Sequence, residues 1–121
     1  MGALATVDVA SGAVQDELVT ISSDSEVVAL GGEIYQLNRS DFDSVRVYAA
    51  GSWSEPNLEI SLEAGANAWD AALCGGALFV SQYETDALAV FDPGTGVLSG
   101  QVDLSAWDDG DGFPEVGSRV V

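Results

Sequence analysis

The chemically most suggestive stretch of this 121-residue chain is an acidic segment near its C-terminal end. Residues 107–115 read Trp-Asp-Asp-Gly-Asp-Gly-Phe-Pro-Glu. Carboxylates separated by glycine turns can surround a hard cation with the oxygen ligands that calcium prefers. The spacing is not that of an EF-hand, because Gly110 stands where a ligand belongs. Two interpretations are open, a solvated acidic connection and a calcium site formed by Asp108, Asp109, Asp111 and Glu115.

The rest of the chain offers little catalytic chemistry. Histidine is absent, so neither a Ser-His-Asp triad nor a Cys-His pair can form. The single cysteine, Cys74, is expected to be a buried free thiol at a strand end, with a disulfide to a cysteine outside this chain as the alternative. Paired carboxylates serve glycosidases, but 20 acidic residues offer too many pairs to single one out. The sequence therefore nominates no catalytic and no cofactor-binding residue.

Anion-binding sites are not indicated either. The only basic residues are Arg39, Arg46 and Arg119, which are too few and too scattered for a clamp on a phosphate or a substrate carboxylate. The glycine pairs at 31–32 and 75–76 lie between predicted strands and lack the following helix and lysine of a phosphate-binding loop.

The composition is that of a globular but strongly acidic protein. Hydrophobic residues make up 47% of the chain, while 20 acidic residues against 3 basic ones give a net charge of −17. Such a surface repels nucleic acids and anionic membranes, and no run of 18 apolar residues is present to span a bilayer. We therefore expect neither nucleic-acid binding nor membrane insertion. Cationic partners, divalent metal or salt suit this charge, and solubility of an exported protein is its simplest explanation.

The elements that would position these residues are short strands. Apolar residues alternate in runs bounded by glycine, proline and aspartate, which is the pattern of an antiparallel β-meander. The clearest meander spans 77–104, with the turn Asp-Pro-Gly-Thr-Gly at 92–96. In this turn Asp92 is expected to bond to the backbone two residues on, Pro93 to fix φ and Gly94 to take a positive φ. The predicted fold class is all-β.

The strand pattern repeats every 44 residues. The pair Gly31-Gly32, followed by an apolar strand, recurs as Gly75-Gly76, and the flanking apolar runs recur with it. Two whole four-stranded units result, at 26–62 and 70–104. Residues 3–22 match only the last two strands of a unit, and residues 113–121 match only a first strand. We therefore predict one partial repeat domain with two, four, four and one strands.

A period of 40–45 residues with four antiparallel strands is the signature of a β-propeller blade. Small residues such as Ala29 and Ala71 suit a first strand crowded around a central channel. Three tryptophans are expected in connections, where large rings wedge neighbouring blades together, with ligand stacking as the alternative; these are Trp53, Trp69 and Trp107. The predicted architecture is an incomplete β-propeller fragment built of four-stranded meanders.

The second unit resembles the YVTN-type propeller repeat. Leu-Phe-Val-Ser at 78–81, Asp-Ala-Leu-Ala-Val-Phe-Asp at 86–92 and Gly-Thr-Gly-Val-Leu at 94–98 are similar to that family's Leu-Tyr-Val strand, Val-x-Val-Ile-Asp strand and Thr-Gly turn. The first unit keeps the apolar positions but lacks the Asp turn. The resemblance implies a propeller in an exported bacterial protein, either periplasmic, secreted or on the cell surface. A WD40 repeat is not indicated, because Trp69-Asp70 precedes a first strand instead of ending a third.

The count of units has a consequence for partners. Closed propellers have roughly 4–8 blades, so two whole blades cannot make a ring. Both end units would then expose edge strands and apolar faces, which recruit further strands or units. We expect these to come from a complementing propeller chain or from further copies of this chain, which would form a homo-oligomer.

Three functional hypotheses follow. The first is a non-catalytic propeller fragment that acts as an interaction and structural scaffold. The second is part of a larger exported propeller enzyme, a hydrolase or lyase, or of a calcium-dependent surface-binding protein. The third is a β-sandwich adhesion domain, which the repeat argues against because a sandwich need not repeat its sequence. Since a fold hosts many functions, these hypotheses rest on analogy and on motifs that are missing.

Overall fold

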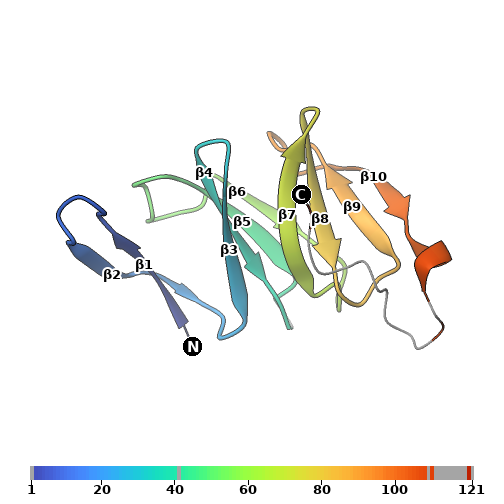
Figure 1. Ribbon diagram of the computed structural model, residues 1–121, viewed down its shortest axis with the longest axis horizontal. Coiled ribbons are helices and arrows are strands. Elements are labelled where there is room, and N and C mark those ends of the chain that lie inside the picture. Colours follow the sequence, from blue (N-terminus) through green and yellow to red (C-terminus); the bar gives the residue numbers. More distant parts are fainter. Residues whose placement is uncertain (1, 41, 109, 111–119, 121) are drawn as a thin grey trace.

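The computed structural model describes residues 2–40, 42–108, 110 and 120. In this part of the chain every element is a strand except one short 3-10 helix, η1 (Ser105–Trp107). The strands form three separate antiparallel sheets that lie side by side along the molecule (Figure 1). The predicted all-β class, with four-stranded antiparallel sheets, is confirmed. No described helix is long and apolar enough to cross a membrane.

The first sheet is a two-stranded hairpin, and the other two are four-stranded meanders. The hairpin consists of β1 (Gly2–Val7) and β2 (Val14–Ile21). The second sheet contains β3 (Ser25–Leu30), β4 (Glu33–Asn38), β5 (Ser44–Ala49) and β6 (Leu58–Ser61). The third contains β7 (Ala68–Cys74), β8 (Ala77–Gln82), β9 (Ala87–Phe91) and β10 (Leu98–Asp103). Each strand pairs only with its neighbours in sequence.

The repeated glycine pairs close the same turn in both four-stranded sheets. Gly31 and Gly32 have φ of 58° and 86°, and Gly75 and Gly76 have φ of 57° and 82°. Two consecutive residues with positive φ make the turn whose twist matches that of the flanking strands, and glycine adopts it without strain. The glycine pairs in the sequence are therefore explained by hairpin geometry.

A second turn recurs between the hairpin and the third sheet. Asp8 N donates to Ala13 O at 2.9 Å and Gly12 N to Asp8 O at 2.8 Å, and the same two bonds join Asp92, Val97 and Gly96 at 2.9 and 2.8 Å. Asp92 Oδ1 accepts from Gly94 N at 2.9 Å, as predicted. The positive φ, however, is that of Gly96, at 71°, and not that of Gly94. The reason is that this turn contains one residue more than a four-residue β-turn.

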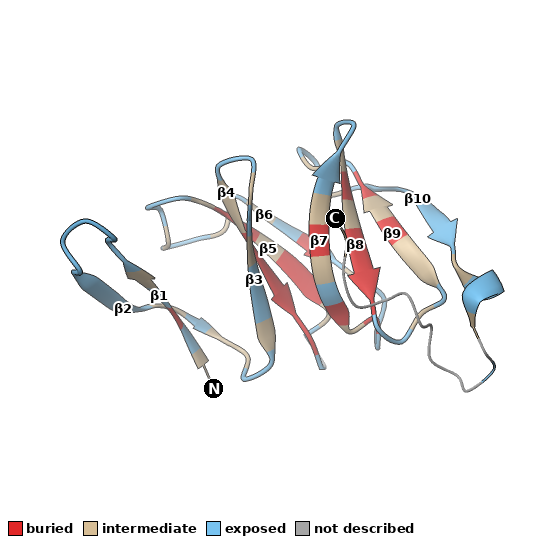
Figure 2. Ribbon diagram, viewed as in Figure 1, coloured by how far each residue is buried: buried red, intermediate tan, exposed pale blue. Residues whose placement is uncertain are grey.

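The hydrophobic core lies between the two four-stranded sheets. Because side chains alternate along a strand, Tyr35 and Leu37 of β4 face this core while Gln36 faces away from it. Buried residues concentrate on β4, β5 and β7–β9, whereas the hairpin and β10 are mostly exposed (Figure 2). The core consists of Tyr35, Leu37, Val45, Val47, Ile60, Ala68, Ala71, Leu78, Val80, Ala89 and Phe91.

The first strands of the two large sheets approach each other closely. A Cβ built on Gly31 would lie 3.2 Å from Leu73 Cδ1, which is tighter than ordinary packing. The absence of a side chain at Gly31 therefore has a packing reason, whereas Ala29 on β3 is exposed.

Candidate functional site

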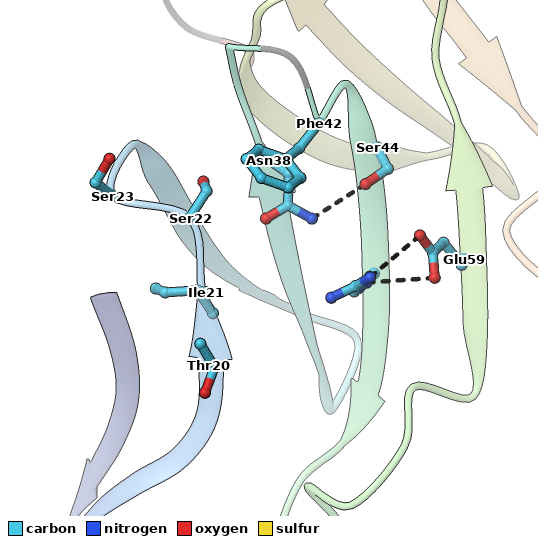
Figure 3. Close-up of a pocket in the computed structure, with 9 residues that line it drawn as sticks. Thr20, Ile21, Ser22, Ser23, Asn38, Phe42, Ser44 and Glu59 are labelled. Carbon is cyan, nitrogen blue, oxygen red and sulfur yellow. Dashed lines mark hydrogen bonds and ion pairs between the residues drawn. The ribbon is translucent and has the colours of Figure 1, made fainter. Parts of the chain in front are cut away.

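The main candidate site is a pocket between the hairpin and the second sheet. It has a volume of about 420 Å³ and is open to solvent. One wall comes from the end of β2 and the connection after it, and the floor comes from β4, β5 and β6 (Figure 3). Its lining consists of Thr20, Ile21, Ser22, Ser23, Asn38, Phe42, Ser44, Arg46 and Glu59.

The pocket floor is the polar face of the second sheet. From 35 to 38 on β4 and from 44 to 48 on β5, the core-facing residues are apolar, and the residues between them carry amides, hydroxyls and a guanidinium. Gln36 Nε2 donates to Asn38 Oδ1 at 2.7 Å, and Asn38 Nδ2 donates to Ser44 Oγ at 3.1 Å. Tyr48 OH donates to Gln36 Oε1 at 3.3 Å. All four side chains are buried, so these bonds offset the cost of removing the polar groups from water.

This network continues toward the hairpin. Ser25 Oγ, at the start of β3, donates to Asn38 Oδ1 at 3.0 Å. Ser22 Oγ, in the connection after β2, lies 2.7 Å from Ser25 Oγ in a hydrogen bond. The amide of Asn38 is thus held from both sides, and its position on the pocket floor is fixed.

An ion pair completes the floor. Arg46 Nε lies 3.3 Å from Glu59 Oε2, and Arg46 Nη2 donates to Glu59 Oε1 at 3.5 Å. The two side chains are 36% and 47% exposed, so solvent screens the pair and it adds little stability. Arg46, Glu59 and Gln36 are cross-strand neighbours, and they form one continuous polar row across β4, β5 and β6.

The hairpin covers the second sheet only in part. A second pocket of about 490 Å³ lies on the same side, and its lining includes Thr6, Gln15, Ile34 and Trp53. Leu4 is the one hydrophobic residue of the hairpin that is buried, at 8% exposure. The two pockets show that an incompletely filled groove runs between the hairpin and the sheet.

The calcium candidates are only partly within the described chain. Asp108 follows η1, and its Oδ1 accepts from Gly110 N at 2.8 Å, which is a local turn contact. Asp109, Asp111 and Glu115 lie outside the described residues. Within the part that is described, no three His, Cys, Asp or Glu side chains come together as a metal-binding group. Calcium binding therefore stays a prediction.

Cys74 and Trp69 differ from their expected environments. Cys74 was expected to be buried, but it is exposed because it ends β7 just before the glycine turn. Trp69 lies within β7 and not in a connection. Its ring centroid lies 4.2 Å from Arg39 Cζ and 5.6 Å from the ring of Tyr83, so its partners are protein side chains.

Arg39 is an inter-sheet bridge that the sequence did not identify. This buried side chain follows β4, and its guanidinium reaches β7 of the next sheet. Arg39 Nε donates to Ala68 O at 2.7 Å and Nη2 to Trp69 O at 3.2 Å, while Nη1 pairs with Asp24 Oδ1 at 3.2 Å. The planar fork of arginine suits several simultaneous acceptors. Its isolation in the sequence gave no sign of these contacts, which span 29 and 30 residues.

Asp43 fixes the connection between the two large sheets. Its carboxylate accepts from Gly65 N at 2.7 Å and from Asn67 N at 3.0 Å, and its carbonyl oxygen accepts from Leu62 N at 2.9 Å. The observed partners lie 22 and 24 residues away, so Asp43 holds the segment that leads into β7.

Comparison with protein-family models, with curated proteins and with solved structures finds no match to this chain. In the described residues the pocket floor provides hydrogen-bonding groups and one screened ion pair.

Proposed function

We propose that this chain is a segment of a β-propeller and works as an interaction and structural scaffold, whose open sheets are completed by another chain or by further copies of itself. The proposal is supported by one observation above all. The face of the third sheet that points away from the core is apolar and partly exposed, yet it corresponds by repeat to a face that is fully covered in the second sheet.

The correspondence follows from strand register. Tyr35 pairs with Val47 in the second sheet, and Phe79 pairs with Val90 in the third. Tyr35 is 0% and Val47 2% exposed, whereas their counterparts are only half-buried. Removing apolar area from water contributes roughly 25 cal/mol per Å², so a further sheet on this face would be stabilising.

The topology supports a propeller over a sandwich. All three sheets are meanders in sequence order, without the Greek-key connections of immunoglobulin-type sandwiches. Consecutive four-stranded meanders joined by short connections are the arrangement of propeller blades. The resemblance to the YVTN-type repeat agrees with this interpretation and adds an exported bacterial setting to the proposal.

The proposal is tested by the mass and stability of the purified full chain. Light scattering after size-exclusion chromatography should give a mass above 12.5 kDa at raised protein concentration. The melting temperature should rise with protein concentration, because association stabilises only the folded chain. A folded monomer whose melting temperature is high and independent of concentration would contradict the proposal.

A further inference from the structure

We propose that copies of this chain associate head to tail, with the exposed face of the β1–β2 hairpin of one copy packed on the open face of the β7–β10 sheet of the next. This inference rests on the proposed scaffold function and specifies its partner as a second copy. It is carried by two exposed faces, each of which includes a pair of residues that corresponds by repeat to a pair in the core: Ala5 and Val7 on the hairpin, and Leu88 and Val102 on the third sheet.

The open face of the third sheet is one half of that contact. In the second sheet, Val45 and Ile60 are cross-strand partners, and both are buried against the third sheet. Their counterparts Leu88 and Val102 are also cross-strand partners, but Val102 is 43% exposed. We name as the open face the side chains of Ala72, Phe79, Leu88, Val90 and Val102.

The hairpin supplies the other half. Its turn at Asp8 has the same backbone hydrogen bonds as the turn at Asp92, which aligns β1 with β9. By this alignment Ala5 corresponds to Ala89 and Val7 to Phe91, and both β9 residues pack in the core at 2% and 4% exposure. On the hairpin the same positions are exposed. We name as the hairpin face the residues Ala3, Ala5, Val7 and Val14.

Burial along β1 agrees with this assignment. Leu4 is buried against the body of the molecule, and the residues that alternate with it are exposed. Val7 is 60% exposed and its cross-strand partner Val14 is 62% exposed, and Val7 also lines the pocket next to Trp53.

The two faces cannot meet within one molecule. The second sheet lies between the hairpin and the third sheet, which stand at opposite ends of the molecule (Figure 1). Different patches of the two copies meet in such a contact, so it is heterologous and extends into a ring or an open chain. The net charge of −17 opposes association, so we expect salt to strengthen it by screening.

The test uses the full chain and two substitutions, Ala5→Glu on the hairpin face and Leu88→Glu on the open face. Each places a carboxylate in an apolar contact and should raise the apparent dissociation constant at least about tenfold, leaving a monomer in sedimentation velocity. An equimolar mixture should regain association as a pair of twice the monomer mass, because each variant keeps the face that the other has lost.

Controls separate assembly from folding. Val9→Glu, at a site 96% exposed in the hairpin turn, should assemble as the unmodified chain does. Circular dichroism checks that each variant folds, and Val102→Glu replaces Leu88→Glu if the latter does not. Assembly that survives both substitutions, or a mixture that stays monomeric, overturns the head-to-tail contact but leaves the scaffold proposal standing. A stable, folded monomer of the unmodified chain overturns both.

Discussion

The two four-stranded sheets have the same strand order and the same glycine turn between their first two strands, but their faces differ in chemistry. The row Gln36, Arg46 and Glu59 of the second sheet is polar and borders the groove. The corresponding row of the third sheet includes Val80 and Ala89, which are apolar and buried in the core. The repeat therefore determines the backbone arrangement, while the side chains on each face of a sheet match what packs on that face.

The opposite faces differ in the reverse sense. Tyr35 and Val47 of the second sheet are completely covered by the third sheet, whereas their counterparts Phe79 and Val90 in the third sheet are only half-buried. The side chains on both of these faces are apolar. The third sheet therefore keeps the apolar chemistry of this face and lacks only a further sheet packed on it. This asymmetry is why the third sheet, and not the polar face of the second, carries the proposed contact.

The largest expected effect concerns the difference in burial between Tyr35 and Phe79. Tyr35→Ala should lower the free energy of unfolding by about 4 kcal/mol, because it empties a fully buried site, and Phe79→Ala by about 2 kcal/mol. Chemical denaturation of both variants, measured at a concentration where the chain is monomeric, gives the two values. Equal losses would show that the two positions are equally covered, contrary to the structure.

Exchanging residues between the two faces should have the next largest effect. Val80→Gln buries an amide without partners and should cost about 3 kcal/mol. Gln36→Val removes two hydrogen bonds, to Asn38 and Tyr48, and should cost about 1 kcal/mol. Urea unfolding is again the measurement. A larger loss for Gln36→Val than for Val80→Gln would mean that the polar face, and not the core face, depends more on its chemistry.

An aspartate precedes the third strand of each four-stranded sheet. Asp43 and Asp86 occupy the same place, since their carbonyl oxygens accept from Leu62 N at 2.9 Å and Leu104 N at 2.7 Å. Only the Asp43 carboxylate has hydrogen bonds to the following connection among the described residues. Asp43→Ala should therefore cost about 1–2 kcal/mol. A melting temperature of Asp43→Ala equal to that of the unmodified chain would contradict the bridging role.

The smallest effect concerns the matched turns and their pH dependence. The Ser11 hydroxyl and N–H hold the pKa of Asp8 below its ordinary value of 3.8, and those of Thr95 do the same for the pKa of Asp92. A carboxyl whose pKa is lowered on folding stabilises the protein above pH 3.8, and this contribution is lost as the pH falls through the folded pKa.

Carbon-detected NMR titration measures both groups. Ser11→Ala and Thr95→Ala should each move the pKa of the neighbouring aspartate back toward 3.8 and leave the other aspartate unchanged. A titration midpoint that does not move in either variant would show that the hydroxyl is not what lowers the pKa.

The sequence by itself determined the local structure. Alternating apolar residues and paired glycines were sufficient to predict the strands, the turns and the four-stranded sheets, because these features depend on neighbours within a few residues. The turn aspartate Asp92 was predicted for the same reason. Two local predictions were wrong. The positive φ is at Gly96 instead of Gly94, because it depends on the width of the turn, and Trp69 lies within β7 instead of in a connection.

Only the tertiary structure decided which face is covered and which residues join the sheets. Alternation defines two faces of a strand but does not show what packs on each, so the polar floor around Asn38 was not predicted. Arg39 and Asp43 bond to residues more than 20 positions away, and no local pattern encodes such partners. Cys74 is exposed for a similar reason, since the burial of a strand end depends on whether another sheet reaches it.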